Sequence, residues 1–288
     1  MIKDFFVVTK FVLSFAVSLS ALFAYIMAKG EIGLDMFLAT FSVLLVAMGV
    51  STLNQVQEYR EDSKMERTKN RPIAAGRMSP RTGVVIAVTL ILISFALIYS
   101  LLGLTGINFF AFAFLWYNLM YTPLKKRSAL AVVPGALLGV IPPAIGWLVA
   151  GHTLFELEFI TVAVYYFIWQ VPHFWLLVML FHGDYKDGGY PTAMRLFGEG
   201  TLQRLTFVWL MLTIQSGVFM VYTFNVYSDI IIGLSIVLGV WAFVTSIKLL
   251  KKEFQLKDAR SIFWKINAAF LGIIILLSVD EYIKHHLV

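Results

Sequence analysis

The chain of 288 residues contains no cysteine, and only 14% of its residues are charged. The absence of cysteine excludes disulfides, thiol catalysis, iron–sulfur clusters and thiolate zinc sites. The scarcity of charge, with 59% hydrophobic residues and a mean hydropathy of +0.82, excludes a soluble globular domain. No linker rich in glycine, proline or serine interrupts the chain, so we expect a single domain over residues 1–288.

Long apolar runs fill the chain, each close to the roughly 20 residues that a helix needs to cross a bilayer. The runs are too long for strands and lack period-two alternation, so they predict helices. The first run is also too long for a signal-peptide core, and we interpret it as a retained span. We therefore predict an all-α polytopic membrane protein with nine transmembrane helices, at residues 5–28, 34–57, 80–101, 106–123, 129–150, 156–182, 202–224, 229–250 and 262–283.

The basic residues test this count. A net charge of +6 can indicate nucleic-acid binding, but here the basic residues cluster in short loops between apolar runs, so we expect no nucleic acid. Of the 23 Lys and Arg residues, only Lys29 and Lys284 lie outside the N-terminus and the loops after spans 2, 4, 6 and 8, with their flanks. The preference of basic residues for the cytoplasm then predicts those segments inside and the C-terminus outside.

Asn54, Glu58 and Asp62 stand four residues apart at the end of the second span. A helix turns about 100° and rises 1.5 Å per residue, so these side chains share one face about 6 Å apart. We call them the oxygen stripe. Oxygen ligands of this kind suit Mg²⁺, and the guanidinium groups of Arg67 and Arg71 just beyond suit phosphate oxygens. Polar groups within a span are costly and usually functional, so the stripe predicts a site for a metal-bound diphosphate.

Two further loops supply groups of the same kind. After the sixth span, Asp184 and Asp187 can bind a second Mg²⁺ across the diphosphate, with Lys186 between them. After the fourth span, Tyr121 and Lys125 can donate hydrogen bonds to the same phosphates. On one membrane side, these loops are expected to face the oxygen stripe.

A fourth segment, residues 169–175, combines aromatic residues with Gln170, Pro172 and His173. Pro172 is expected to kink the sixth span, which is tolerated where the backbone faces a cavity. Gln170 and His173 are then candidates to face a second substrate. Histidine can ligate haem iron or transfer a proton, and the sequence leaves both roles open. The Pro142-Pro143 pair in the fifth span indicates a broken helix, either lining a pocket or simply packing closely.

Together these segments resemble the UbiA superfamily of intramembrane prenyltransferases, and Glu58 and the Pro172-His173-Phe174 triplet favour its haem-farnesylating branch over quinone-ring prenylation. The resemblance covers nearly the whole chain through Asn54-x3-Glu58-x3-Asp62-x2-Met65-x-Arg67-Thr68-x2-Arg71-Pro72, Tyr121-x3-Lys125, Pro142-Pro143-x2-Gly146-Trp147, Trp169-Gln170-x-Pro172-His173-Phe174 and Asp184-Tyr185.

This resemblance implies nine helices around a central cavity in a bacterial-type plasma membrane. It implies transfer of farnesyl from farnesyl diphosphate to a vinyl group of haem B, giving haem O for terminal oxidases. Haem A synthase and oxidase assembly factors become candidate partners. The implied catalytic residues are Asn54, Glu58, Lys125 and Asp184; the Mg²⁺ ligands are Asn54, Glu58, Asp62, Asp184 and Asp187; the substrate-binding residues are Arg67, Arg71, Tyr121, Gln170, His173 and Lys186.

Two other functions stay open at this point. One is a related prenyltransferase that acts on an aromatic quinone precursor. The other is a transporter of an anionic lipid or a metal ion, because polar groups inside spans serve transport as well as catalysis.

Overall fold

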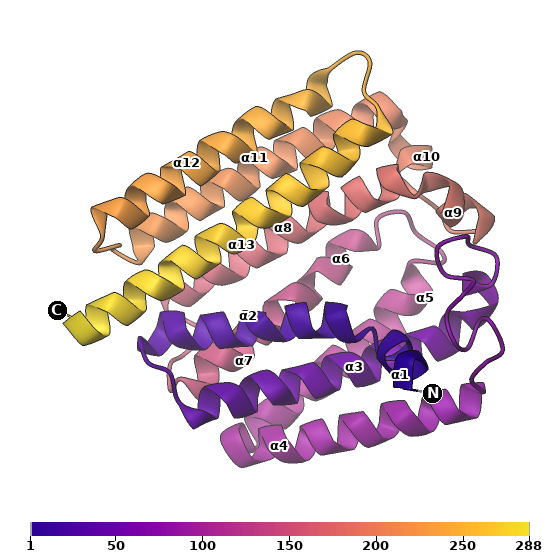
Figure 1. Cartoon of the computed structure of the whole chain (residues 1–288), viewed down its shortest axis with the longest axis horizontal. Helices are drawn as coiled ribbons and strands as arrows, with labels where there is room; N and C mark the ends of the chain where they lie inside the picture. Colours follow the sequence, from indigo (N-terminus) through magenta and orange to yellow (C-terminus); the bar gives the residue numbers. More distant parts are fainter. Residues whose placement is uncertain (1, 288) are drawn as a thin grey trace.

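The computed structural model describes residues 2–287, and within that range every regular element is a helix (Figure 1). In chain order the elements are α1 (Ile2–Val8), α2 (Phe11–Lys29), α3 (Leu34–Asp62), α4 (Pro80–Phe114), the π-helix η1 (Leu115–Tyr121), α5 (Thr122–Leu124), α6 (Val132–Ala136), the 3₁₀-helix η2 (Leu137–Val140), α7 (Ile141–Val149), α8 (Leu157–Leu180), α9 (His182–Asp187), α10 (Ala193–Phe197), α11 (Glu199–Thr223), α12 (Asp229–Ser246), the 3₁₀-helix η3 (Ile247–Leu250) and α13 (Leu256–Leu287).

Eight helical segments are long and apolar enough to cross a membrane, and one of them, Pro80–Leu124, contains a reversal. At Gly103 the backbone adopts φ 56° and ψ −138°, a conformation that favours glycine. The rings of Phe95 and Phe110 lie 6.0 Å apart, whereas one straight helix would separate them by about 22 Å. The segment is therefore a helical hairpin, and residues 2–287 cross nine times, as the charge pattern predicts.

The first expected span, 5–28, is divided in two. Helix α1 ends at Val8 and α2 begins at Phe11, and Lys10 between them has a φ of 48° in the left-handed region. In Figure 1, α1 is turned away from the direction of α2 and lies beside the end of the bundle. A cation at this break is what separates the short helix from the apolar run.

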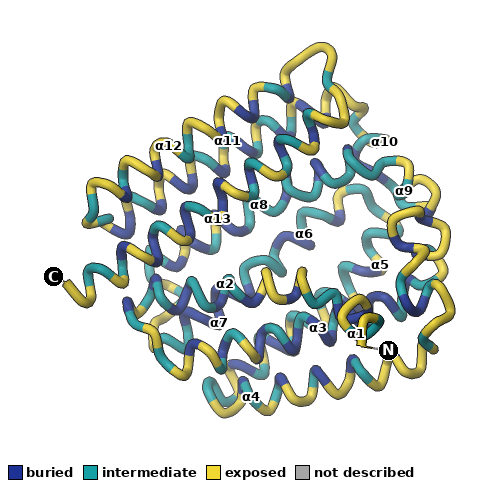
Figure 2. The backbone as a smooth tube through the Cα atoms, viewed as in Figure 1, coloured by how far each residue is buried: buried dark blue, intermediate teal, exposed yellow. Residues whose placement is uncertain are grey.

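The spans form two groups, α2–α7 and α8 with α11–α13, that are joined firmly at one end (Figure 1). An apolar cluster at that end contains Met27, Trp147, Phe159 and Phe224, which come from the ends of α2, α7, α8 and α11. The chain's C-terminus lies at this end, and the N-terminus lies at the other, which we call the site end. Exposed residues line the outer faces of the helices, as lipid contact requires (Figure 2).

The fifth span is broken, as its prolines predict, into α6, η2 and α7. Gly146 of α7 packs directly on α2, because a Cβ atom there would lie 2.0 Å from the carbonyl oxygen of Ala21. Gly139 of η2 leaves room for the side chain of Gln170, whose Oε1 would lie 1.8 Å from an added Cβ. In the broken span, Gly146 thus allows close contact between α7 and α2, and Gly139 makes space for the polar side chain of Gln170.

We expect Gly146→Ala to lower the free energy of unfolding by about 2 kcal/mol, because the added methyl group meets backbone rather than a movable side chain. Gly233 lies within α12 with nothing inside 4 Å of an added Cβ, so Gly233→Ala is the matched control and should cause no loss. Thermal unfolding of the purified variants in detergent measures both. Equal stability of the two variants would contradict the close helix contact.

Candidate active site

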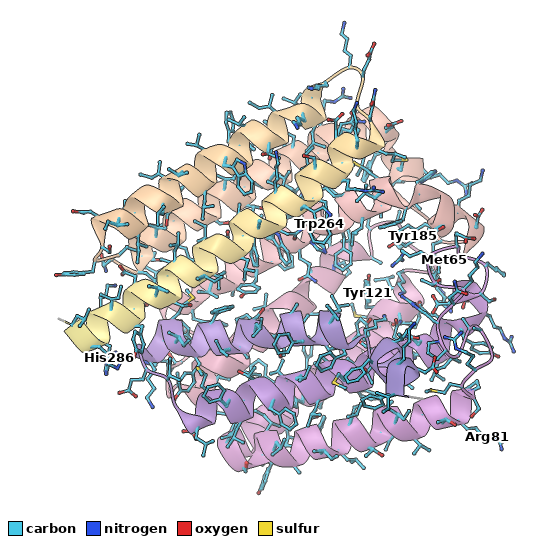
Figure 3. All side chains as sticks on the ribbon, viewed as in Figure 1. Met65, Arg81, Tyr121, Tyr185, Trp264 and His286 are labelled. Atoms are coloured by element: carbon cyan, nitrogen blue, oxygen red, sulfur yellow. The ribbon has the colours of Figure 1, made fainter. Side chains whose placement is uncertain are left out.

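Charged and hydroxyl side chains from four segments meet at the site end. They come from the last turns of α3, the loop 63–79, the η1–α5 segment and α9. Figure 3 shows Met65, Tyr121 and Tyr185 near one another at this end. The sequence prediction that these loops share one side of the molecule is thus confirmed in the described residues.

The oxygen stripe is buried. Asn54, Glu58 and Asp62 are 1%, 3% and 1% exposed, and α3 continues to Asp62, so the helical spacing holds throughout. The amide of Asn54 donates to Oε2 of Glu58 at 2.9 Å and to the hydroxyl of Thr122 at 3.1 Å. A carboxylate buried this deeply requires a compensating charge nearby.

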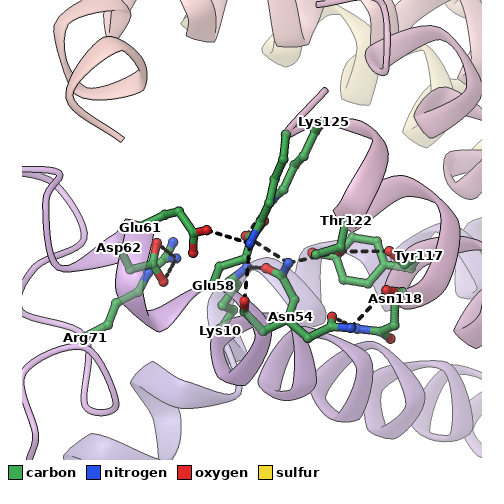
Figure 4. Close-up of polar contacts among 12 residues, drawn as sticks. Lys10, Asn54, Glu58, Glu61, Asp62, Arg71, Tyr117, Asn118, Thr122 and Lys125 are labelled. Atoms are coloured by element: carbon green, nitrogen blue, oxygen red, sulfur yellow. Dashed lines mark hydrogen bonds and ion pairs between the residues drawn. The ribbon is translucent and has the colours of Figure 1, made fainter. Parts of the chain in front are cut away.

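That charge comes from other elements. Each side chain of the stripe is held by one cation, in the three pairs Lys10–Asn54 at 3.0 Å, Lys125–Glu58 at 2.7 Å and Arg71–Asp62 at 2.7 and 2.8 Å (Figure 4). One guanidinium nitrogen of Arg71, Nη1, donates to both carboxylate oxygens of Asp62. Lys126 binds Glu61 on the same turn at 2.7 Å. Lys125 and Arg71, which the sequence predicts as phosphate-binding groups, thus hold the two acids of the stripe.

Lys10 is a site residue that the sequence reasoning missed. The side chain of Gln55 donates to the carbonyl oxygens of Val7 and Val8 at 2.9 and 3.0 Å, and Thr52 also bonds to Val8. These bonds satisfy carbonyl groups at the end of α1 that a helix leaves open. Helix α3 therefore fixes the turn that directs Lys10 at its own stripe. The only signal in the sequence is a lysine within an apolar run.

Burial lowers the pKa of Lys10 to about 7, and the nearby charges of Arg71 and Lys125 add to this shift. A non-glycine residue in the left-handed region also costs free energy, and such strain collects at functional sites. Both features indicate that the position of this amine is imposed by the surrounding structure.

Asp184 of α9 reaches the same cluster from the second group of spans. Its carboxylate accepts a hydrogen bond from the backbone N–H of Arg67 at 3.2 Å and lies 4.0 Å from Nε of that residue. The pKa of neighbouring Tyr185 is raised, chiefly by burial. The positive charges of Arg67 and Arg71 oppose this shift, and the negative charges of Glu58 and Asp184 add to it. Tyr185 thus lies within the field of both acidic sites.

The other two charged residues of α9 point elsewhere. Asp187 is exposed and makes no hydrogen bond or ion pair among the described residues, so the structure joins Asp184 but not Asp187 to the loop that follows the stripe. Lys186 is also exposed and lines a pocket beside the site.

The π-helix η1 positions the groups of the third segment. Its wider turn carries Tyr121, and the ammonium group of Lys125 lies 5.5 Å from the centre of that ring. Lys125 also lies 5.8 Å from the ring of Tyr190. Burial raises the pKa of Tyr190, and the negative charges of Glu58 and Glu61 add to it. Single π-helical turns occur often at functional sites, and this one was not predicted.

His173 is held in one orientation by Asn267 of α13. The amide nitrogen of Asn267 donates to the carbonyl oxygen of Phe263 at 2.5 Å, so the amide oxygen faces the ring and lies 2.8 Å from Nδ1 of His173. Because that oxygen only accepts, Nδ1 must donate. The Nε2 lone pair of His173 is left for a ligand or a proton. The ring centres of Trp169 and His173 lie 4.8 Å apart.

The site fits a magnesium ion only with help from a substrate. Among residues 2–287 no three His, Cys, Asp or Glu side chains are close enough to form a complete metal cluster. Oε1 of Glu58 is nevertheless buried without a hydrogen-bond donor. Mg²⁺ commonly takes one or two carboxylates and completes its shell with water and phosphate oxygens. The oxygen stripe supplies that kind of partial shell.

Comparisons with known proteins agree with this geometry. Residues 16–271 match the model of the UbiA prenyltransferase family. A protoheme IX farnesyltransferase of Flavobacterium psychrophilum is 32% identical over 98% of this chain and 95% of its own. One of Oleidesulfovibrio alaskensis is 35% identical over 61% of this chain and 62% of its own.

Solved structures show the same fold at low identity. A digeranylgeranylglyceryl phosphate synthase superposes with a TM-score of 0.75 at 15% identity, covering 98% of each chain. A UbiA homolog from Archaeoglobus fulgidus bound to GPP and Mg²⁺ superposes with a TM-score of 0.68 at 12% identity, and the match covers 96% of this chain and 99% of the homolog.

The strained turn at Lys10 allows folding and binding to be separated. Lys10→Gly should leave the free energy of unfolding unchanged or raise it by about 1 kcal/mol, because glycine adopts the left-handed conformation without strain. The same change should weaken Mg²⁺-dependent binding of inorganic pyrophosphate about tenfold by removing a charge-assisted contact. Lys10→Met keeps the strained backbone but loses the amine, so it should lower both the free energy of unfolding and the affinity for pyrophosphate. Calorimetry and thermal unfolding measure these effects, and unchanged pyrophosphate affinity in both variants would remove Lys10 from the site.

Proposed function

Because the chain belongs to the UbiA prenyltransferase family, we propose that it transfers a farnesyl group from farnesyl diphosphate to a vinyl group of haem B, giving haem O. The observation that carries this proposal is the buried oxygen stripe with one cation on each member. It is supported by relatives that are named protoheme IX farnesyltransferase and align over nearly the whole chain.

The donor diphosphate would bind at the stripe. Its oxygens would compete for the cations that hold the stripe, chiefly Lys10, Arg71 and Lys125. As a cation moves to phosphate, it uncovers an oxygen of the stripe. Asn54, Glu58, Asp62 and Asp184 would then hold Mg²⁺, which supplies charge neutralisation for the leaving diphosphate. Arg67 and Tyr121 would extend these contacts, and Lys186 and Asp187 would join them only if α9 moves.

The reaction needs no protein nucleophile. The allylic C–O bond breaks, and the diphosphate leaves with the bonding electrons, which the cations stabilise. The vinyl group of haem attacks C1 of the farnesyl cation. Water then adds to the resulting cation and loses a proton, which leaves a hydroxyethylfarnesyl group. What the chain provides is orientation in a site from which bulk water is kept away until the last step.

The acceptor would lie on the side of Gln170 and His173. Oε1 of Gln170 is buried without a partner, and Nε2 of His173 is the free nitrogen of a fixed ring. This nitrogen can ligate the iron of haem B or accept the proton that water releases. In either role it acts on the acceptor and leaves the diphosphate contacts untouched.

We also propose that the site end faces the cytoplasm of a bacterial-type cell. The loops at that end hold the large majority of the basic residues, as the preference for the inner side requires. Haem A synthase and oxidase assembly factors remain candidate partners, because haem O is consumed on the way to terminal oxidases.

Glu58→Gln and Asp184→Asn should each lower turnover at least about a hundredfold, the size expected when a group that stabilises charge in the transition state is lost. Glu66→Gln, on the exposed loop beside the site, removes one carboxylate without changing the stripe and should keep wild-type turnover. Labelled farnesyl diphosphate and haem B in detergent, with mass analysis of the extracted haem, measure the product. Chelation of Mg²⁺ should abolish transfer.

The same assay separates the rival functions. Transfer of label to 4-hydroxybenzoate instead of haem B would reassign the acceptor to a quinone precursor. A protein that binds the diphosphate but never releases pyrophosphate, with or without Mg²⁺, would be a transporter rather than an enzyme.

His173 and Asn267 should behave as one unit. Asn267→Leu and His173→Ala are each expected to lower haem farnesylation about tenfold or more without changing pyrophosphate affinity. Because Asn267 acts through the ring, the double variant should be no worse than His173→Ala alone. Additive losses in the double variant would show that Asn267 does not work by orienting the histidine.

A further inference from the structure

A pocket of about 680 Å³ opens beside the oxygen stripe at the site end. Four Lys or Arg side chains and one histidine line it, and no Asp or Glu does. We call it the cationic pocket, and it is lined by Lys126, Arg127, His182, Lys186, Tyr190 and Arg195 together with small and apolar residues of the 189–194 segment.

The charges of this pocket are gathered by the fold and not by a basic run. Arg127 comes from the loop after α5, Lys186 from α9 and Arg195 from α10. None of the three makes an ion pair among the described residues, whereas Arg71, Lys125 and other cations of the same end are paired. Like charges brought together in one concavity repel each other, so the arrangement favours an anion between them.

Two residues that line the cationic pocket, Lys126 and Tyr190, also border the active site. Lys126 lines the pocket and binds Glu61 on the last turns of α3 at 2.7 Å. Tyr190 lines it as well, and the ammonium group of Lys125 lies 5.8 Å from its ring. A ligand anchored in the pocket would therefore contact side chains that also border the active site.

The diphosphate has other cations, namely Lys10, Arg67, Arg71 and Lys125, so the cations of the pocket are available to a second anion. The proposed acceptor carries one: haem B bears two propionate carboxylates on one edge and its vinyl groups toward the opposite edge. Carboxylates suit the forked contacts of arginine, and Pro191 and Met194 offer apolar surface for a porphyrin edge.

We propose that the cationic pocket binds the propionate carboxylates of haem B, through Arg127, Lys186 and Arg195. This assignment rests on haem as the acceptor. With the propionates at the mouth of the pocket, the vinyl edge points inward past Tyr190 toward the oxygen stripe. The pocket would then set which edge of the porphyrin meets the farnesyl cation.

The test compares haem B with its dimethyl ester, which keeps the porphyrin and loses both charges. Absorbance titration of the full-length protein in detergent should give about a tenfold or greater preference for the free acid. Arg127→Gln and Arg195→Gln should each weaken haem binding several-fold, and the double variant should no longer distinguish acid from ester. Lys251→Gln removes one exposed charge from another loop at the same end and is the matched control, with wild-type binding expected.

Three results would overturn the assignment. Equal binding of acid and ester by the wild type is the first. Loss of pyrophosphate affinity in Arg127→Gln and Arg195→Gln, with haem binding unchanged, would assign the pocket to the donor instead. Equal loss in Lys251→Gln would reduce the effect to general surface charge. Farnesyl transfer measured in parallel keeps the two proposals apart, because transfer without acid–ester discrimination rejects the pocket alone, and discrimination without transfer rejects the reaction.

Discussion

The site end depends on one constraint: carboxylates buried at the end of a membrane helix must be neutralised by groups from other helices. Glu58 and Asp62 are 3% and 1% exposed, and leaving either without a counter-charge would cost several kcal/mol. Lys125 and Arg71 meet this need from two separate segments, and Lys10 from a third segment binds Asn54 of the same stripe. The turn after α1, the π-helix η1 and the loop 63–79 are therefore held around α3 by the same groups that a phosphate would recruit.

Which parts of the site could be predicted from the sequence depends on whether they arise from local geometry or from contacts between distant residues. The spacing of Asn54, Glu58 and Asp62 fixes their common face because helical geometry is local, and the hydrophobic runs fix the crossings because the bilayer sets their length. The reversal at Gly103 lay between two expected spans for the same reason. The pairing of each acid with its own cation could not be predicted, because it depends on contacts between residues far apart in the chain, such as Lys125 with Glu58.

The acceptor side shows the same limit more strongly. His173 stood out in the sequence as a histidine among aromatic residues, but its role depends on Asn267, which lies 94 residues away and carries no motif. The π-helical turn before Thr122 likewise has no local signature. The common face of the oxygen stripe thus follows from a short-range pattern, whereas the orientation of His173 arises from how α8 packs against α13.

That packing has a consequence for the order in which the protein becomes competent during synthesis. Every residue of the oxygen stripe and its cations precedes Tyr190, whereas the amide that orients His173 belongs to α13 and is synthesised after all of them. A nascent chain in which α13 has not yet entered the bilayer would hold the proposed diphosphate-binding groups but have an imidazole free to rotate. Insertion of α13 would then be the step that completes the acceptor side of the proposed site.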